Sequence, residues 1–277
     1  MKRTVNQYKL GIESFGVRIS VETNDPGALR PIRDAVFVAL PGCVRETLNH
    51  ESKHRFVFFR DEFGDFSVFK DRETVIESAD RVRALVYLVS RIRTAAAEFA
   101  VDRVFLHSGV VSWNGKAILF PGESFSGKTS LTAEFVRRGA VYYSDEYAVL
   151  DGAGRVHPFP KTLSMRGIID DYQQVEHSAE AIGGRSATES AVVGAVIFTA
   201  FSKSGHWEPA PITQGEAMLE LIKHTLPIRT STEFSLTVLK LIASNAMLLK
   251  SDRGEATATA PSIIEYLDPR FRTAHRS

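Results

Sequence analysis

One segment of the chain has the residue types and the spacing of a phosphate-binding loop. Residues Gly122 to Thr129 read Gly-Glu-Ser-Phe-Ser-Gly-Lys-Thr, which fits the pattern G-x-x-x-x-G-K-[ST]. The two glycines allow the backbone to curl, so that several N–H groups can converge on one anion. Lys128 is expected to reach the β- and γ-phosphates of a nucleotide, and Thr129 to offer its hydroxyl to Mg²⁺. The alternative is a surface turn that only resembles this motif.

The pattern therefore predicts a nucleotide site, with ATP and Mg²⁺ as the bound groups. Its expected residues are those of the loop and the one that follows it: Gly122, Glu123, Ser124, Phe125, Ser126, Gly127, Lys128, Thr129 and Ser130.

The flanking segments predict the elements that such a loop needs. The apolar run Ala117–Phe120 indicates a buried strand that leads into the loop. Asn114-Gly115 predicts a two-residue hairpin turn before it, with residues 104–113 as the partner strand. A helix is expected after the loop, with Gly139 as its C-terminal cap. Its apolar side is formed by Leu131, Phe135 and Val136. The order of strand, glycine loop and helix is the one that phosphate binding requires.

Phosphoryl transfer also needs carboxylates, and two of them follow the next strand. Asp145 and Glu146 come after the apolar segment 141–143. Because the carboxyl end of such a strand faces the ligand crevice in an open α/β sheet, we predict that Thr129, Asp145 and Glu146 position Mg²⁺. The alternative is a solvated acidic pair at a strand end. His107 lies in the strand 104–113, where a packed, hydrogen-bonded histidine is the ordinary alternative to a functional one.

The composition excludes several other classes of protein. The 277 residues include 34 Lys and Arg against 33 Asp and Glu, so the net charge of +1 gives no case for a nucleic-acid or membrane partner. The single cysteine, Cys43, excludes an internal disulfide framework and fits a reducing cytosol. No secretory signal opens the sequence, and no apolar run approaches about 18 residues. We therefore expect a cytoplasmic protein.

Two regions are expected along the chain. Residues 1–78 form a β-rich N-terminal segment, in which 56–59 and 66–69 predict a hairpin. Residues 79–277 form an α/β domain that carries the loop. It opens with a helix over 79–99, whose apolar stripe is expected to be Val82, Leu85, Val86, Val89, Ile92, Ala96 and Phe99.

Five segments, in this order, resemble successive landmarks of the HPr kinase/phosphorylase family. They are His107-Ser-Gly109, the loop 122–129, Ser144-Asp145-Glu146, residues 163–169 and Pro227-Ile-Arg229. The resemblance covers about residues 100–250 and implies a P-loop kinase domain related in fold to phosphoenolpyruvate carboxykinase. The broader group includes peptide kinases of lasso-peptide clusters. The chain looks more like such a divergent relative than like the enzyme that regulates sugar uptake.

The resemblance implies roles for single residues. His107 matches the motif histidine that supports the catalytic acid, and Asp145 matches the acid that serves as base toward the acceptor serine. Glu146 matches the second acid, which is usually aspartate in the family. Ser124 matches a residue at the nucleotide phosphates. Two further residues match the family's Glu-x-Arg-Gly segment: Arg166 and Gly167.

Two positions depart from the family pattern. Ser164 stands where the Glu-x-Arg-Gly segment has a metal-linked glutamate. The downstream glycine-arginine pair is also absent, so the arginine expected on the transferring phosphate has no counterpart unless Arg229 takes its role. The predicted catalytic residues are therefore Asp145, His107, Lys128 and Arg229.

These observations predict an ATP- and Mg²⁺-dependent kinase for a serine or threonine hydroxyl of a protein or peptide. The resemblance also implies a homo-oligomer, since family members tend to be hexamers. Ser164 and the missing arginine favour the alternative of a non-catalytic nucleotide sensor. A kinase for a small molecule is a further alternative, which would need a closed pocket rather than an open groove.

Overall fold

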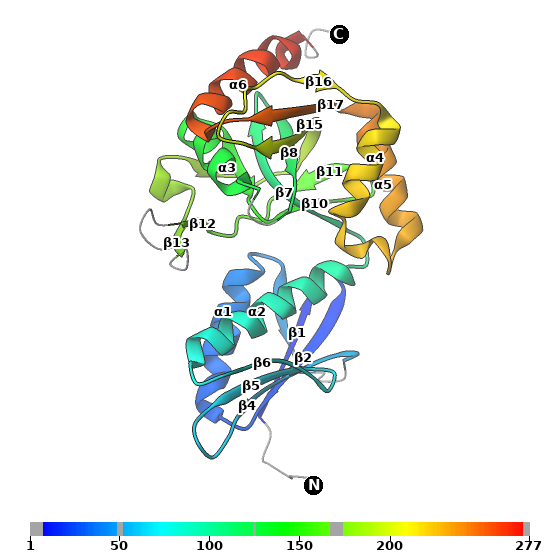
Figure 1. The fold of residues 1–277 in the computed structure, drawn as a ribbon. Helices are drawn as coiled ribbons and strands as arrows, with labels where there is room; N and C mark the ends of the chain where they lie inside the picture. Colours follow the sequence, from blue (N-terminus) through cyan, green and yellow to red (C-terminus); the bar gives the residue numbers. More distant parts are fainter. Residues whose placement is uncertain (1–7, 49–51, 124–125, 167–173, 274–277) are drawn as a thin grey trace. The chain divides into compact units, whose positions relative to one another are not determined.

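The structure is a computed structural model that describes residues 8–48, 52–123, 126–166 and 174–273. The chain forms two compact units, Met1–Asp102 and Arg103–Ser277 (Figure 1). Both units combine helices with β-sheet, so the chain is a mixed α/β protein, as predicted.

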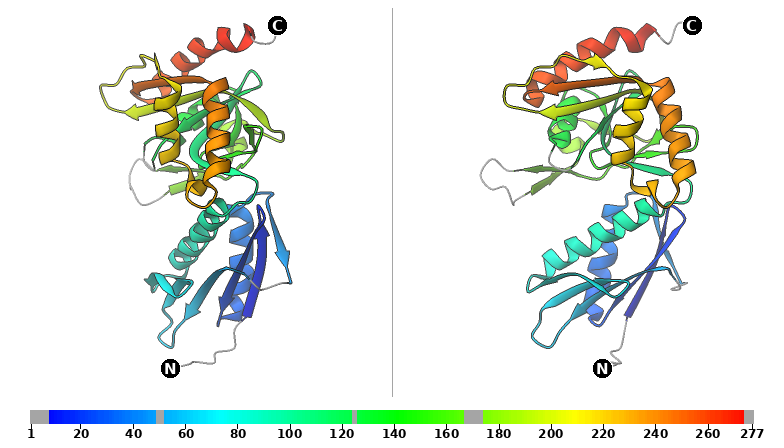
Figure 2. Two further views of the ribbon diagram at one scale, coloured as in Figure 1. Left: turned by 90° about the vertical axis from the view of Figure 1, so that its right-hand side faces the viewer. Right: turned by 45° about the vertical axis from the view of Figure 1, so that its right-hand side comes forward.

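The first unit is a sheet with two helices packed side by side against it (Figure 2). Its strand order is β3-β1-β2-β4-β5-β6, and only the pair β2–β4 is parallel among the described strands. The elements are β1 (Tyr8–Ser14), β2 (Val17–Thr23), α1 (Leu29–Ala39), β3 (Val44–Thr47), β4 (His54–Arg60), β5 (Phe66–Lys70), β6 (Glu73–Ser78) and α2 (Arg81–Glu98), with a 3-10 turn at Pro26–Ala28. Alternate residues of β4, such as Phe56 and Phe58, are buried because successive strand side chains point to opposite faces.

The predicted hairpin is confirmed as β4 and β5, which pair in an antiparallel register. The boundary between the two regions lies at Asp102 rather than at residue 78, because α2 packs against β4, β5 and β6 of the first sheet. The predicted stripe of α2 is correct at Val89, Ile92 and Ala96 but wrong at its start. Val82 and Val86 are 68% and 60% exposed. Four residues outside the predicted stripe are buried instead: Ala84, Leu88, Ala95 and Ala97.

In the described part of the second unit, nine strands form one mixed sheet. Their order is β14-β9-β7-β10-β11-β15-β17-β16, with β8 paired to both β7 and β15. The bounds are β7 (Val104–Trp113), β8 (Lys116–Pro121), β9 (Val141–Ser144), β10 (Tyr147–Leu150), β11 (Arg155–His157), β14 (Arg185–Ser186), β15 (Ala191–Phe201), β16 (Ala210–Pro211) and β17 (Met247–Arg253). A separate hairpin is formed by β12 (Leu163–Arg166) and β13 (Gln174–His177). Strands β8, β15 and β17 run parallel, so their carboxyl ends lie at the same edge.

Helices cover both faces of this sheet (Figure 1). Helices α3 (Lys128–Arg137) and α6 (Ala256–Thr273) pack on one face, through residues such as Phe135 and Leu267. Helices α4 (Gln214–Lys223) and α5 (Thr232–Asn245) pack on the other, through residues such as Leu221 and Leu239. Two 3-10 turns, η2 (Glu180–Ile182) and η3 (Leu226–Ile228), join the elements. Both faces of the sheet that contains β8 are therefore covered by helices.

Candidate functional site

The strand and the helix predicted to flank residues 122–129 are both present. Asn114 and Gly115 both have positive φ, of 49° and 77°, and close the β7–β8 hairpin as predicted. Strand β8 then enters the loop, where the Gly122 N–H donates to the His107 carbonyl at 3.3 Å. Gly127 has a φ of +81°, a left-handed conformation that glycine adopts without strain, and α3 begins at the next residue. Ser124 and Phe125 lie outside the described residues.

Helix α3 and strand β7 approach each other closely at Gly109. A Cβ atom at Gly109 would lie 2.5 Å from Thr132 Oγ1 and 3.6 Å from Lys128 Cβ. Glycine at this strand position therefore allows the first turn of α3 to rest directly on β7. The N-terminal end of the helix, with its partial positive charge, is held beside the strand that carries His107.

Lys128 is a buried cation within the loop. Lys128 is only 8% exposed, and its ammonium donates to the Glu123 carbonyl at 2.6 Å. Burial lowers the pKa of Lys128 to about 8, although the nearby acids Glu146, Asp145 and Glu123 act in the opposite direction. A desolvated ammonium of this kind gains free energy when an anion replaces its lost hydration.

Thr129 and Asp145 meet in the structure as the sequence analysis expects. The Thr129 hydroxyl donates to Asp145 Oδ2 at 3.1 Å. Asp145 is 7% exposed, and burial raises the pKa of its carboxyl; Lys161, the Thr129 hydroxyl and the Ser164 amide pull this pKa down, while Glu146 raises it. The carboxylate thus lies in a desolvated position beside the first turn of α3.

The acid pair occupies an interruption between two strands. Strands β9 and β10 both pair with β7, and Asp145 and Glu146 lie between them. The Ser144 hydroxyl accepts from the N–H groups of Glu146 and Tyr147 at 3.1 and 3.0 Å. The Ser108 N–H donates to the Glu146 carbonyl at 3.2 Å, which ties the turn back to β7. This arrangement differs from an acid at the end of a parallel strand, because the chain continues along β7 after the pair.

Two residues that the sequence analysis missed lie at the acids. Lys161 Nζ is 3.9 Å from Glu146 Oε2 and 3.2 Å from the Ser164 hydroxyl. The Tyr142 hydroxyl lies 2.5 Å from the Lys161 carbonyl oxygen and 3.3 Å from Asp145 Oδ1. Burial, together with the charge of Asp145, raises the pKa of Tyr142 well above its usual value, so this hydroxyl stays neutral. No spacing in the sequence links residue 161 to the loop, and only the fold brings it there.

A carboxylate, that of Glu176, lies beside Ser164. The hydroxyls of Thr162 and Ser164 each donate to a carboxylate oxygen of Glu176. Glu176 lies on β13, directly opposite Ser164 on β12. A carboxylate therefore stands beside position 164 on the neighbouring strand. The side chain of Arg166 and all of Gly167 lie outside what the structure describes.

The histidines and Arg229 occupy different places around the loop. The backbone of His107 links two segments of the site: its carbonyl accepts from Gly122, and its N–H donates to the His224 carbonyl at 2.8 Å. Burial lowers the pKa of His224, and the positive charge of Lys128 lowers it further. Arg229 is exposed at the end of η3. Within the described residues, no hydrogen bond or ion pair joins it to the loop or the acids.

The donor set fits a hard cation that is shared with phosphate. The described residues contain no cluster of three His, Cys, Asp or Glu side chains that could hold a metal alone. Mg²⁺ commonly takes one or two protein carboxylates, with phosphate oxygens and water completing its shell. Thr129, Asp145 and Glu146 offer oxygens of this kind at the N-terminal end of α3.

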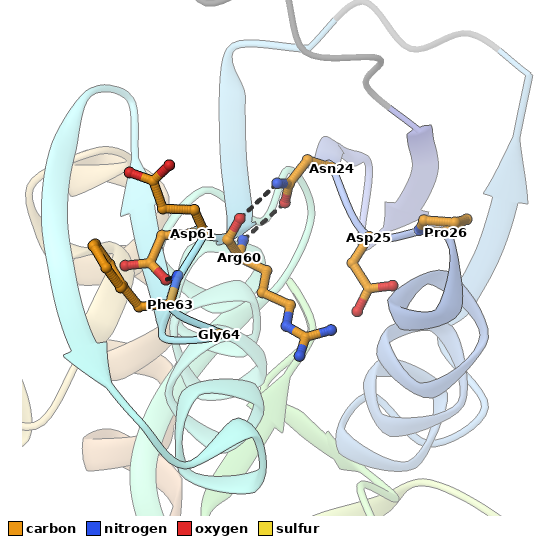
Figure 3. A pocket seen from close by; sticks show the side chains of 8 residues that line it. Asn24, Asp25, Pro26, Arg60, Asp61, Phe63 and Gly64 are labelled. Atoms are coloured by element: carbon orange, nitrogen blue, oxygen red, sulfur yellow. Dashed lines mark hydrogen bonds between the residues drawn. The ribbon is translucent and has the colours of Figure 1, made fainter.

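The first unit contains a hollow of about 380 Å³, lined by charged and polar side chains (Figure 3). Its lining is Asn24, Asp25, Pro26, Arg60, Asp61, Glu62, Phe63 and Gly64. Its polar groups hold their own loops: Asp61 Oδ1 accepts from the Phe63 and Asp65 amides, both at 2.9 Å. The Asn24 side chain donates to and accepts from the backbone of Arg60, at 2.7 and 2.8 Å. We therefore place the candidate site in the second unit.

Comparison of the chain with protein-family models gives no match, and comparison with curated proteins gives none either. Within the described residues, no helix has the length and apolar character needed to cross a membrane.

Proposed function

We propose that the chain is an ATP- and Mg²⁺-dependent phosphotransferase of the HPr kinase-like type, acting on a serine or threonine hydroxyl of a protein or peptide. The second unit would then be a P-loop kinase domain of the HPr kinase/phosphoenolpyruvate carboxykinase type. The observation that carries the proposal is the 3.1 Å contact between Thr129 and Asp145, next to the buried Lys128. It joins a phosphate-binding motif to a desolvated carboxylate, the two parts that phosphoryl transfer needs.

Each residue has a physical role in this proposal. Lys128 and the amides at the start of α3 hold the β- and γ-phosphates, since both carry positive charge into a buried position. Thr129, with Asp145 or Glu146, would hold Mg²⁺, which when bound neutralises charge on the β- and γ-oxygens. Lys161, close to the acids, lowers the pKa of Asp145 and offers a cation near the transferring group.

Asp145 supplies the proton acceptor. The acceptor hydroxyl oxygen forms a bond to the γ-phosphorus as the bond from that phosphorus to the β,γ-bridging oxygen breaks, and ADP leaves. Asp145 takes the hydroxyl proton. Burial raises the pKa of this carboxyl, which makes it a stronger base than an exposed aspartate once it is ionised. The low polarity around it also strengthens its attraction to that proton.

The test is transfer of labelled γ-phosphate from ATP to a panel of proteins and peptides that contain serine or threonine. Lys128→Ala and Asp145→Ala are expected to abolish transfer, whereas Arg229→Ala decides whether Arg229 contributes. Nucleotide binding that raises the melting temperature, but without transfer to any substrate, would instead support the nucleotide sensor. Transfer to free sugars or other small molecules alone would support the small-molecule kinase. We further propose that the protein acts in the cytoplasm, where ATP is available.

A further inference from the structure

Arg253 lies under the 122–129 loop and was not found by the sequence analysis. It is the last residue of β17, and it is only 2% exposed. One nitrogen of its guanidinium, Nη2, donates to the Ser126 carbonyl at 3.1 Å and to the Gly127 carbonyl at 2.9 Å. The other, Nη1, donates to the Gly254 carbonyl at 3.0 Å. A distant strand end thus binds the backbone of the loop.

The position of Arg253 follows from the parallel strands of the sheet. Because β8, β15 and β17 are parallel, the residues at their carboxyl ends lie at one edge. Phe201 ends β15 and stands opposite Arg253 in the register. The guanidinium carbon of Arg253 lies 5.4 Å from the centre of the Phe201 ring, which favours a fixed orientation of the guanidinium plane.

The charge of Arg253 has no carboxylate bonded to it within the described residues. Its guanidinium nitrogens Nη1 and Nη2 donate to backbone carbonyls, and its Nε is buried with no hydrogen-bond partner in the described part of the chain. Burial lowers the pKa of Arg253, and the nearby Glu255 opposes this shift. A buried cation is costly unless an anion offsets it. A bound phosphate chain would be such an anion.

The two carbonyl contacts also determine where the loop amides point. In a trans peptide, the C=O of one residue and the N–H of the next point in opposite directions. Holding the Ser126 and Gly127 carbonyls toward Arg253 therefore directs the N–H groups of Gly127 and Lys128 away from it. These groups belong to the start of α3, where amides have no acceptor within the helix.

The fit between Arg253 and the loop also depends on Gly127. A Cβ atom at this position would lie 2.2 Å from Arg253 Nη2, so a side chain there would displace the guanidinium. The glycine of the motif thus serves two purposes here, because it permits the left-handed backbone and leaves room for the guanidinium.

We propose that Arg253 is the positioning residue of the phosphate-binding loop. Its guanidinium binds the carbonyls of Ser126 and Gly127, so that the amides of Gly127 and Lys128 face the bound phosphates. This inference rests on the proposed function for its ligand, a nucleoside polyphosphate. Arg253 does not itself touch the reacting atoms, and its contribution passes through the backbone of the loop.

The first measurement needs no ligand. Hydrogen–deuterium exchange of the segment 126–131 is compared between the wild type, Arg253→Met and the control Arg155→Met. Arg155 also donates to a backbone carbonyl of the second unit, that of Ser190 at 2.8 Å. We expect Arg253→Met to speed exchange of the hydrogen-bonded amides of this segment, those of Ser126 and Leu131, by about tenfold or more, as loss of over 1 kcal/mol of local stability implies. Unchanged exchange in this segment would overturn the inference.

The second measurement uses ATP and inorganic tripolyphosphate as probes, with affinity determined by calorimetry. Arg253→Met is expected to weaken both by about 10- to 100-fold, and Arg155→Met to leave both unchanged. In Arg253→Ala, added millimolar guanidinium should restore part of the affinity, which a merely destabilised fold would not show. Equal loss in both methionine variants, or no rescue, would count against the inference.

One outcome separates this inference from the proposed function. If the wild type binds neither probe, the proposed function fails, and the exchange measurement alone decides whether Arg253 holds the loop. If Arg253→Met does not fold, Arg253→Lys takes its place. Lysine keeps the charge but cannot hold several carbonyls in a fixed plane, so faster loop exchange is still expected. Wild-type exchange in Arg253→Lys would overturn the role of the guanidinium.

Discussion

The first-unit hollow and the 122–129 loop both gather charged side chains, but they treat those charges differently. In the hollow, carboxylates such as Asp25 and Asp61 accept hydrogen bonds from nearby backbone amides and so stabilise their own turns. At the loop, three charged residues are buried: Lys128, Asp145 and Arg253. Burial lowers the pKa of Lys128 and of Arg253 and raises that of Asp145, so it disfavours the charged form of each. Charges that cost folding free energy are typical of sites where a ligand supplies the missing interaction.

The largest expected difference concerns phosphoryl transfer. Asp145→Asn removes the proton acceptor but retains the size of the side chain, so we expect transfer to fall by about 10³-fold. The matched change in the hollow, Asp61→Asn, is expected to leave transfer unchanged. The rates are measured with the same substrate and saturating nucleotide. Comparable losses in the two variants would remove the distinction between the two regions.

A smaller effect is expected on nucleotide binding. Lys128→Met removes a charged donor from the loop, which should weaken ATP binding by about 100-fold. Arg60→Met, which changes a residue lining the hollow, serves as the control and should bind ATP like the wild type. Calorimetric titration of both variants gives the comparison. A hollow that binds nucleotide would show the reverse order of effects.

The pH dependence of binding follows from Lys128. Its pKa of about 8 means that the free protein loses this proton as the pH rises above 8, whereas phosphate binds the protonated form. We therefore expect ATP affinity to be flat between about pH 7 and 8 and to fall by up to about tenfold per pH unit above that range. The terminal phosphate does not interfere, since its second pKa is about 6. Lys128→Arg should flatten the profile, because arginine stays charged; an unchanged profile in this variant would rule out Lys128 as its cause.

The smallest expected effects are on stability, and they have opposite signs. The pKa of Asp145 is raised in the folded protein above its ordinary value of 3.8, so its stabilising contribution is present below pH 3.8 and is lost as the pH rises through the raised value. Asp145→Asn should therefore raise the melting temperature at neutral pH, with a gain that shrinks toward pH 4. Asp61→Ala should instead lower the free energy of unfolding by about 1–2 kcal/mol, because it removes the acceptor for two amides. Thermal unfolding across pH 4–8 measures both changes in stability. Two variants that are both stabilised, or both destabilised, at neutral pH would contradict the difference between the two regions.

The parts of the fold that the sequence predicts are those governed by local rules. The hairpin at Asn114-Gly115, the helix after the loop and the strand pair β4–β5 depend on neighbouring residues and are confirmed. Helix α1 was not predicted, because Pro26-Gly27 indicates a turn; yet Pro31 lies in the first helical turn, where its missing N–H costs nothing. The face of α2 was misjudged at its start because alanines, rather than the larger valines, pack against the sheet.

The candidate site divides in the same way. Lys128 and Thr129 stand at motif spacing, the acid pair follows the next predicted strand, and the structure brings Thr129 and Asp145 into contact. Lys161, Glu176 and Arg253 carry no such pattern: Lys161 precedes β12, Glu176 lies on the paired strand β13, and Arg253 ends the distant strand β17. A positive charge was expected from Arg229, but the structure buries one at Arg253 instead. Sheet topology alone supplies that information.

The contact between Arg253 and the loop joins residues 127 positions apart in the chain, so the ribosome makes the loop long before it makes Arg253. At about 5–20 residues per second, a ribosome needs roughly 6–25 s to add this stretch. A nascent chain therefore contains the complete Gly-Lys-Thr motif well before β17 exists to support it. Contacts of such high contact order form late in folding. The loop can gain its final shape only after almost the whole second unit has been synthesised, so premature termination before residue 253 yields a chain with the motif but without its support.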